Sequence, residues 1–254
     1  MRAIIEDIKY FSDKRFTTLA GTLVYFLLMS VTPFLFWLTF LLGEIDLSGI
    51  VSHDLFQAIA PMLEYLENSA KGAAGSAGII LLLTSLWSST NFFYHLRRSG
   101  EIIFDSNLKR GLSLRLSSLF AVFFTILLIA LATAVPFLSY NVLENIMPKF
   151  VADAISLTFI TMFAYFAAFF LNKFACPYKL EFEDAAAGAL LTVLLWILFA
   201  AGFSVYLTFA NPQKLYGAIT AVIVFLLWCY LMVNSLVIGI IYNGKYFHAP
   251  LRLK

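Results

Sequence analysis

The feature that most constrains this chain is a series of uninterrupted apolar runs, each long enough to cross the roughly 30 Å hydrocarbon core of a bilayer as a helix. Apolar residues make up 61% of the 254-residue sequence and charged residues only 13%. A soluble domain averages about 45–50% apolar and about 25% charged residues, so one buried core cannot account for this excess. The sequence therefore predicts an integral membrane protein and argues against a soluble enzyme.

The runs predict an all-α, polytopic fold with six transmembrane helices in a single domain that covers residues 1–254. The predicted spans are 19–42, 77–96, 116–138, 154–171, 185–206 and 217–241. The second span is the weakest, because it is strongly apolar only as far as Trp87 and then becomes rich in Ser, Thr, Asn and His.

Two amphipathic stretches lie outside the spans. At the N-terminus, Ile4, Ile5, Ile8 and Phe11 recur at helical spacing, which predicts an interfacial helix. A second stripe lies between the first two spans and predicts an amphipathic helix on the outer face of the membrane. Its members are Leu47, Val51, Leu55, Ile59, Met62 and Leu66. The simplest role for both helices is to cap the bundle at the lipid surface.

The distribution of Lys and Arg predicts the orientation of the chain. Most of these residues lie in the two terminal stretches and in the second and fourth loops: Arg2, Lys9, Lys14, Arg15, Arg97, Arg98, Lys109, Arg110, Arg115, Lys173, Lys179, Lys245, Arg252 and Lys254. The other loops contain only Lys71, Lys149 and Lys214. Because cytoplasmic loops carry the excess of positive charge, both termini are expected in the cytoplasm of a cell whose inner (plasma) membrane holds the protein.

Polar residues inside the first, second and sixth spans recur at helical spacing, and the predicted topology puts most of them in the cytoplasmic half of the bilayer. An Asn amide lacks partners against lipid tails, so Asn91 and Asn234 are expected to face protein or water. These faces predict a polar cavity that opens to the cytoplasm. The candidate substrate-cavity residues are Thr22, Tyr25, Ser30, Ser88, Asn91, His95, Tyr230 and Asn234.

A structural interpretation of the same residues stays open. The polar faces are equally typical of interhelical hydrogen bonds, each of which contributes about 0.6–2 kcal/mol. His95 fits a hydrogen-bonded residue at the inner interface as well as it fits a proton relay. Pro33 is expected to kink or end its helix, whereas Gly188 and Gly217 are expected to let helices pack closely.

Several kinds of chemistry are disfavoured. The centres of the spans lack Asp, Glu, Lys and Arg, and the lack of a buried carboxylate argues against a carboxylate-based antiporter. The three His residues are far apart, and the two cysteines, Cys176 and Cys229, do not form a zinc or disulfide pattern, so no metal or cofactor is expected. A net charge of +2 gives no indication of a nucleic-acid partner, which leaves membrane lipids as the expected partners.

The run from Thr17 to Tyr25, followed by Ser30 and Pro33, resembles the first-span motif of the YihY/BrkB family of membrane proteins, which was historically labelled ribonuclease BN. Further matches follow in the same order along residues 17–241. They are Asn91 with Arg97 and Arg98, then Pro177, Asp184, Gly188 and Ala189, then Tyr216, Gly217, Trp228, Tyr230 and Gly239. The family usually has Gly-Ala-Glu near the end of the last span, where this chain has Gly239-Ile240-Ile241, so no role of that Glu carries over.

The resemblance implies a six-span inner-membrane protein whose family has been linked to transport of ions or lipid-like molecules and to envelope integrity or serum resistance. We expect a transporter or flippase of a lipid-like or amphiphilic substrate. The alternatives are a non-transporting envelope scaffold and a cation/proton antiporter. Ribonuclease activity is not expected, because a metal-dependent nuclease needs clustered Asp, Glu or His ligands.

Overall fold

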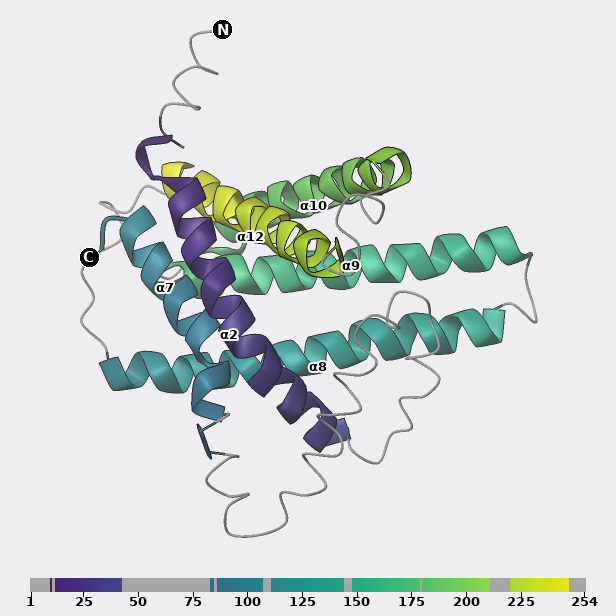
Figure 1. Cartoon of the computed structure of the whole chain (residues 1–254), viewed down its shortest axis with the longest axis horizontal. Coiled ribbons are helices and arrows are strands. Elements are labelled where there is room, and N and C mark those ends of the chain that lie inside the picture. Colours follow the sequence, from purple (N-terminus) through teal and green to yellow (C-terminus); the bar gives the residue numbers. More distant parts are fainter. Residues whose placement is uncertain are drawn as a thin grey trace, which may run out of the picture. The chain divides into compact units, whose positions relative to one another are not determined.

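The computed structural model describes residues 10, 12–42, 83–84, 86–106, 111–143, 148–178, 180–210 and 220–246. The regular secondary structure of these residues is helical, without a strand, which confirms the predicted all-α class (Figure 1). The helices are α2 (Phe16–Leu42), α7 (Asn91–Ile103), α8 (Gly111–Leu143), α9 (Lys149–Ala175), α10 (Phe182–Ala210) and α12 (Thr220–Tyr246). Helices suit such apolar sequences because every backbone hydrogen bond is made within the segment, as a bilayer requires.

Within the described residues, four helices have a stretch long and apolar enough to cross a membrane. These stretches are Gly111–Ala132, Lys149–Ala175, Phe182–Tyr206 and Ile223–Tyr246, and Phe16–Ser30 is a shorter apolar stretch of α2. The predicted count of six spans stays a prediction. The predicted outer-face helix lies outside the described residues, as does Gly217, and so does nearly all of the N-terminal interfacial helix.

The described part of the loop predicted over residues 97–115 is largely helical. Helix α7 continues past the predicted span end at residue 96 to Ile103, so it contains Arg97 and Arg98, and α8 begins at Gly111, so it contains Arg115. A helix continues through such a residue because a long Arg side chain can reach the interface while its backbone stays hydrogen-bonded. The bounds of the membrane spans themselves stay a prediction.

The chain divides into two compact units. Unit 1 comprises Met1–Val24, Leu96–Arg110 and Phe123–Lys254, and unit 2 comprises Tyr25–His95 and Gly111–Val122. The prediction of one domain over residues 1–254 stays a prediction.

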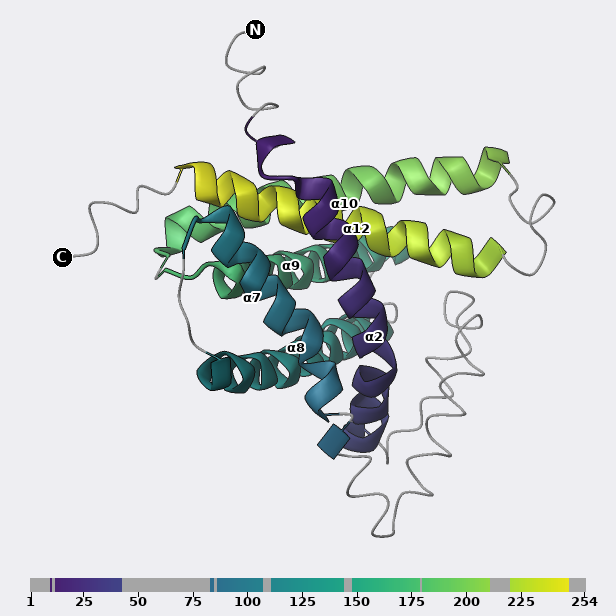
Figure 2. The same ribbon diagram turned by 60° about the vertical axis from the view of Figure 1, so that its left-hand side comes forward.

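In unit 1, α10 packs along α12 and α9 packs along α10 (Figures 1 and 2). Helices α10 and α12 approach closely where Gly188 and Gly239 meet. A Cβ atom on Gly239 would collide with the Thr192 hydroxyl oxygen and the Gly188 carbonyl oxygen, and a Cβ on Gly188 would collide with the Asn243 side chain. The prediction that Gly188 serves close packing is consistent with this geometry.

One part of the contact between α9 and α10 is apolar, with small side chains surrounded by aromatic rings. Ala168, Ala189 and Val193 form its buried centre, against which Tyr165 and Trp196 pack. A second cluster at the start of α10 contains Cys176, Leu180 and Ala185. Both cysteines are free, and burial raises the pKa of the Cys176 thiol to about 12, so this thiol is unreactive at neutral pH.

Burial differs sharply between the helices of unit 1. Only 6% of the most apolar stretch of α9 is buried, whereas the corresponding figure for α12 is 44%. Large apolar side chains are exposed along α9 and the later half of α10, among them Leu157 and Leu198. A soluble protein rarely exposes so much apolar surface, and in an integral membrane protein this surface contacts lipid tails.

Candidate functional site

Two polar clusters lie among these apolar helices, one in each unit. The first, in unit 2, begins at Ser30 of α2, which is only 4% exposed. The Ser30 hydroxyl donates to the Ser88 carbonyl oxygen over 3.2 Å and accepts from the Phe92 backbone N–H, also over 3.2 Å. The Ser88 hydroxyl in turn lies 3.5 Å from the Met29 carbonyl oxygen. These hydrogen bonds fix α2 against the segment that leads into α7.

Arg115 is the charged residue of the unit 2 cluster. Its Nη1 atom donates to the Asn91 side-chain oxygen over 2.8 Å and to the Thr90 hydroxyl over 3.1 Å. Its guanidinium carbon lies 4.1 Å from the ring centre of Tyr94 and 4.8 Å from that of Trp87. Contacts of this kind between a cation and a ring contribute about 0.5–2 kcal/mol each, so they hold the guanidinium in place. Trp87, Thr90, Asn91, Tyr94 and Arg115 are called the Arg115 cluster below.

Arg115 lies near the N-terminal end of α8. It is the fifth residue of a helix that spans about 50 Å at 1.5 Å per residue, and hence about 6 Å from the start of that helix. Around the helix axis it lies between a buried face, which contains Leu114, Ser118 and Val122, and an exposed face. The exposed face holds Leu112, Leu116 and Phe120, which are 79%, 68% and 67% exposed.

Neighbouring arginines make different contacts. Arg98 pairs with the Glu101 carboxylate over 2.6 Å, and Arg97 donates to the Phe174 carbonyl oxygen near the C-terminus of α9 over 2.8 Å. For Arg115, the hydrogen bonds within the described residues are the two to neutral acceptors, and no described carboxylate pairs with it. Among the described residues, its charge is therefore stabilised by dipoles and rings.

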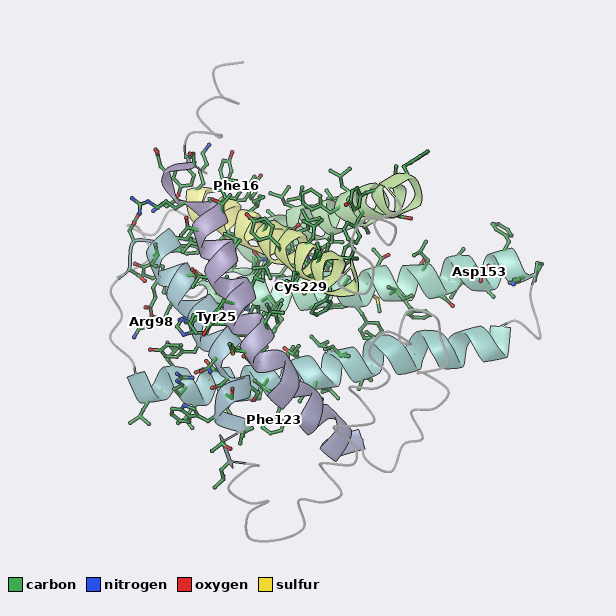
Figure 3. All side chains as sticks on the ribbon, viewed as in Figure 1. Phe16, Tyr25, Arg98, Phe123, Asp153 and Cys229 are labelled. Atoms are coloured by element: carbon green, nitrogen blue, oxygen red, sulfur yellow. The ribbon has the colours of Figure 1, made fainter. Side chains whose placement is uncertain are left out.

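Described carboxylates lie at helix ends or between helices. Asp153 is the fifth residue of α9 (Figure 3), and Glu183 and Asp184 lie in the first turn of α10. Asp105, which lies beyond α7, pairs with Lys14 over 2.6 Å. Within the described part of the chain, no three His, Cys, Asp or Glu side chains are grouped so that they could bind a metal ion.

The second polar cluster, in unit 1, joins α9, α10 and α12 and is almost fully buried. The Asn243 amide nitrogen donates to the Asn172 side-chain oxygen over 3.0 Å, and the Gly188 N–H donates to the Asn243 side-chain oxygen over 2.8 Å. The Asn172 amide donates to the Ala168 carbonyl oxygen and to the Thr192 hydroxyl, which itself donates to Gly188. Asn172, Thr192 and Asn243 are at most 3% exposed. We call this set the amide network.

Asn234 and Tyr230 lie on the same helix, α12, but on another face. At 100° per residue, Asn234 points about 140° away from Gly239, through which α12 contacts α10. Asn234 is 7% exposed, and its side-chain oxygen has no hydrogen-bond partner among the described residues. A desolvated amide oxygen without a partner costs about 1–3 kcal/mol, so the Asn234 oxygen differs from the Asn243 oxygen on the same helix, which accepts from Gly188.

The remaining predicted site residues have varied surroundings. The His95 ring stacks on Phe26, with ring centres 3.4 Å apart, and Tyr25 is 55% exposed with its ring edge-on to Phe26. The Thr22 hydroxyl donates to the Thr18 carbonyl oxygen one turn earlier, so its hydrogen bond is made within its own helix. Helix α2 continues through Pro33 without ending there.

The structure brings Ser30, Ser88 and Asn91 together in unit 2, whereas Tyr230 and Asn234 belong to unit 1. That these two groups line one cavity stays a prediction. Sequence reasoning missed Arg115 itself. The sequence does indicate that its partners share one helix face, because residues 87, 90, 91 and 94 follow helical spacing.

Comparison with known proteins agrees with the membrane character of the fold. A family model described as virulence factor BrkB matches residues 8–246. A UPF0761 membrane protein of Vibrio atlanticus (strain LGP32) is 24% identical over 243 residues, which cover 87% of this chain and 74% of that protein. YfkH of Bacillus subtilis (strain 168), which carries a ribonuclease-like name, is 25% identical over 244 residues, covering 87% and 86% of the two chains. No solved structure matches the chain.

Proposed function

Since the chain belongs to the BrkB family of integral membrane proteins, as its motifs indicated, we propose that it moves a lipid-like, amphiphilic substrate across the membrane from a polar site on the cytoplasmic side. The observation that supports this proposal is the Arg115 cluster. A guanidinium without a carboxylate partner among the described residues lies beside an apolar helix face, and an amphiphile needs both of these surfaces at once.

The described acids favour an amphiphile over a bare cation as the substrate. A coupling site for sodium or protons commonly places a carboxylate within the membrane. Here Asp153 is the fifth residue of α9, and Glu183 and Asp184 lie in the first turn of α10. A cation/proton antiporter is therefore the weaker alternative, and replacing Asp153 with Asn is expected to leave substrate movement unchanged.

A non-transporting envelope scaffold is the second alternative. It would need the amide network and the apolar faces for assembly, but it would not need an unpaired cation. Catalysis has no support in the described residues, because the His, Cys, Asp and Glu side chains that a metal-dependent ribonuclease requires are not grouped there.

The test is lipid movement by the purified full-length chain in proteoliposomes. Headgroup-labelled fluorescent lipid is added to both leaflets, and dithionite then bleaches only the label that reaches the outer leaflet. The proposal predicts that bleaching exceeds 50% and rises with the number of protein molecules per vesicle. Bleaching that stops at about half for lipids of every headgroup, with the protein folded, would favour the scaffold.

The proposed orientation places the Arg115 end of α8 and both chain termini in the cytoplasm. Reporter fusions at Lys109 and Lys254 are expected to report the inside, and a cysteine introduced at Lys149 is expected to react with a membrane-impermeant reagent from outside. A periplasmic report from Lys109 would reverse the orientation.

A further inference from the structure

We propose that the Arg115 cluster binds the phosphate of an anionic phospholipid headgroup. The inference rests on the proposed function, and it adds the chemical class of ligand and the atoms that hold it. It starts from the donor atoms of Arg115, since a guanidinium has five N–H donors and no acceptor.

Both N–H groups of Nη1 are used within the protein, by Asn91 and Thr90. The Nε–H and the neighbouring Nη2–H point in the same direction, and neither has an acceptor among the described residues. This edge of the guanidinium is the one that donates two parallel hydrogen bonds to the two oxygens of a phosphate or carboxylate. The cluster thus occupies one edge of Arg115 and presents the other.

The partners of Nη1 are suited to holding an arginine for an external anion. Asn91 and Thr90 accept hydrogen bonds but carry no negative charge, so they orient the guanidinium without neutralising it. The Tyr94 and Trp87 rings contact the cation in the same way. An Asp in place of Asn91 would form an ion pair with Arg115, as Glu101 does with Arg98.

The surroundings favour a lipid over a soluble anion. On α8, Leu112 lies before Arg115, and Leu116 and Phe120 lie after it; each of the three is at least 67% exposed. Arg115 itself lies about 6 Å from the start of α8, and the proposal requires this end of the helix to lie at the level of the bilayer phosphates. A phospholipid can therefore place its phosphate on the guanidinium and its acyl chain along this apolar face.

The experiment compares lipid binding by the purified full-length chain in detergent, using native mass spectrometry with equal amounts of phosphatidylglycerol and phosphatidylcholine. If the site is specific, protein with one bound phosphatidylglycerol should exceed protein with one bound phosphatidylcholine by about fivefold or more. Arg115→Gln should reduce this ratio to near one. The matched control is Arg15→Gln, which removes an exposed positive charge without a described partner and is expected to keep the preference.

Asn91→Asp is the second variant, and it tests the same site even if Arg115→Gln does not fold. The two side chains have nearly the same shape, and the new carboxylate pairs with Arg115 from within the protein. The expected result is again loss of the preference for phosphatidylglycerol. A preference that survives in a folded Asn91→Asp or Arg115→Gln variant, or that falls equally in Arg15→Gln, would overturn the site.

A parallel titration with glycerol 3-phosphate identifies the source of the phosphate. The lipid site predicts that this soluble ester binds at least tenfold more weakly than phosphatidylglycerol, because it lacks the acyl chains. Adducts of glycerol 3-phosphate that depend on Arg115, without any lipid preference, would contradict the assignment to a lipid. Binding at equilibrium does not require transport, so headgroup binding without lipid movement would overturn only the proposed function, and lipid movement without headgroup preference would overturn only this inference.

Discussion

The amide network of unit 1 and the Arg115 cluster of unit 2 differ in whether their hydrogen bonds close within the protein. In the amide network, the Asn243 amide nitrogen donates to the Asn172 side-chain oxygen, and the Asn243 side-chain oxygen accepts from the Gly188 N–H. In the Arg115 cluster, Nε and Nη2 have no acceptor among the described residues. Both clusters hold polar groups in an apolar surrounding, but within the described part of the chain only the Arg115 cluster has a cation with N–H donors that lack an acceptor.

This difference separates structural from ligand-binding polarity. A closed network makes helix packing specific and contributes to stability, because each buried group has its partner. An open cluster contributes less to stability than its polar content suggests, and its spare donors are available to a ligand. Substitutions should therefore lower stability in unit 1 and lower binding in unit 2.

The largest loss of stability is expected from Gly239→Ala. The new Cβ would collide with Thr192 and the Gly188 backbone, so α10 and α12 must separate, at a cost of about 3 kcal/mol. Gly202→Ala on α10 is the matched control, since no atom lies within 4 Å of its Cβ position, and it should leave stability unchanged or raised. Thermal unfolding in detergent measures both, and equal melting temperatures would contradict the close approach of the two helices.

A smaller loss is expected from Asn172→Leu, which removes the acceptor of the Asn243 amide and should cost about 1–3 kcal/mol. Asn243→Leu should cost a similar amount. Because the double variant removes both partners, its loss should be clearly less than the sum of the two single losses. Additive losses in this double-mutant cycle would show that the two amides do not act as one network.

Asn91→Asp should separate stability from function. The carboxylate closes the Arg115 cluster with an ion pair, which is expected to raise the free energy of unfolding by up to about 1 kcal/mol while lowering the movement of anionic lipid. Thermal unfolding and the proteoliposome assay on the same preparation measure the two effects. Faster movement of anionic lipid by Asn91→Asp would contradict a role for the free guanidinium.

The smallest effect is expected from Asp105→Asn. Its carboxylate lies 2.6 Å from the Lys14 amine, but the Asp105 side chain is 82% exposed, so water competes for the pair. The expected change in stability is at most about 0.5 kcal/mol, and Asn also tolerates the positive φ of 50° at this position. A loss as large as that of Asn172→Leu would show that this surface pair fixes the chain more firmly than its exposure suggests.

The sequence predicted the helical class and the membrane character because long apolar runs have few other solutions in a bilayer. It did not show that Arg115 belongs to a helix, because an apolar run does not mark where the helix begins, and α8 begins four residues earlier. It also missed the amide network. Asn243 lies beyond the predicted end of the last span, and Asn172 is 71 residues away from it along the chain, so their hydrogen bond depends on tertiary packing that no local pattern encodes.

The contrast between the two clusters is tested most directly by measuring stability and lipid movement together for Arg115→Gln and Asn172→Leu. Arg115→Gln is expected to keep a melting temperature within a few degrees of the wild type and to lose most of its movement of phosphatidylglycerol. Asn172→Leu is expected to melt earlier but to move the lipid normally per folded molecule. The account would be contradicted if Arg115→Gln moved phosphatidylglycerol at the wild-type rate while Asn172→Leu, still folded, did not.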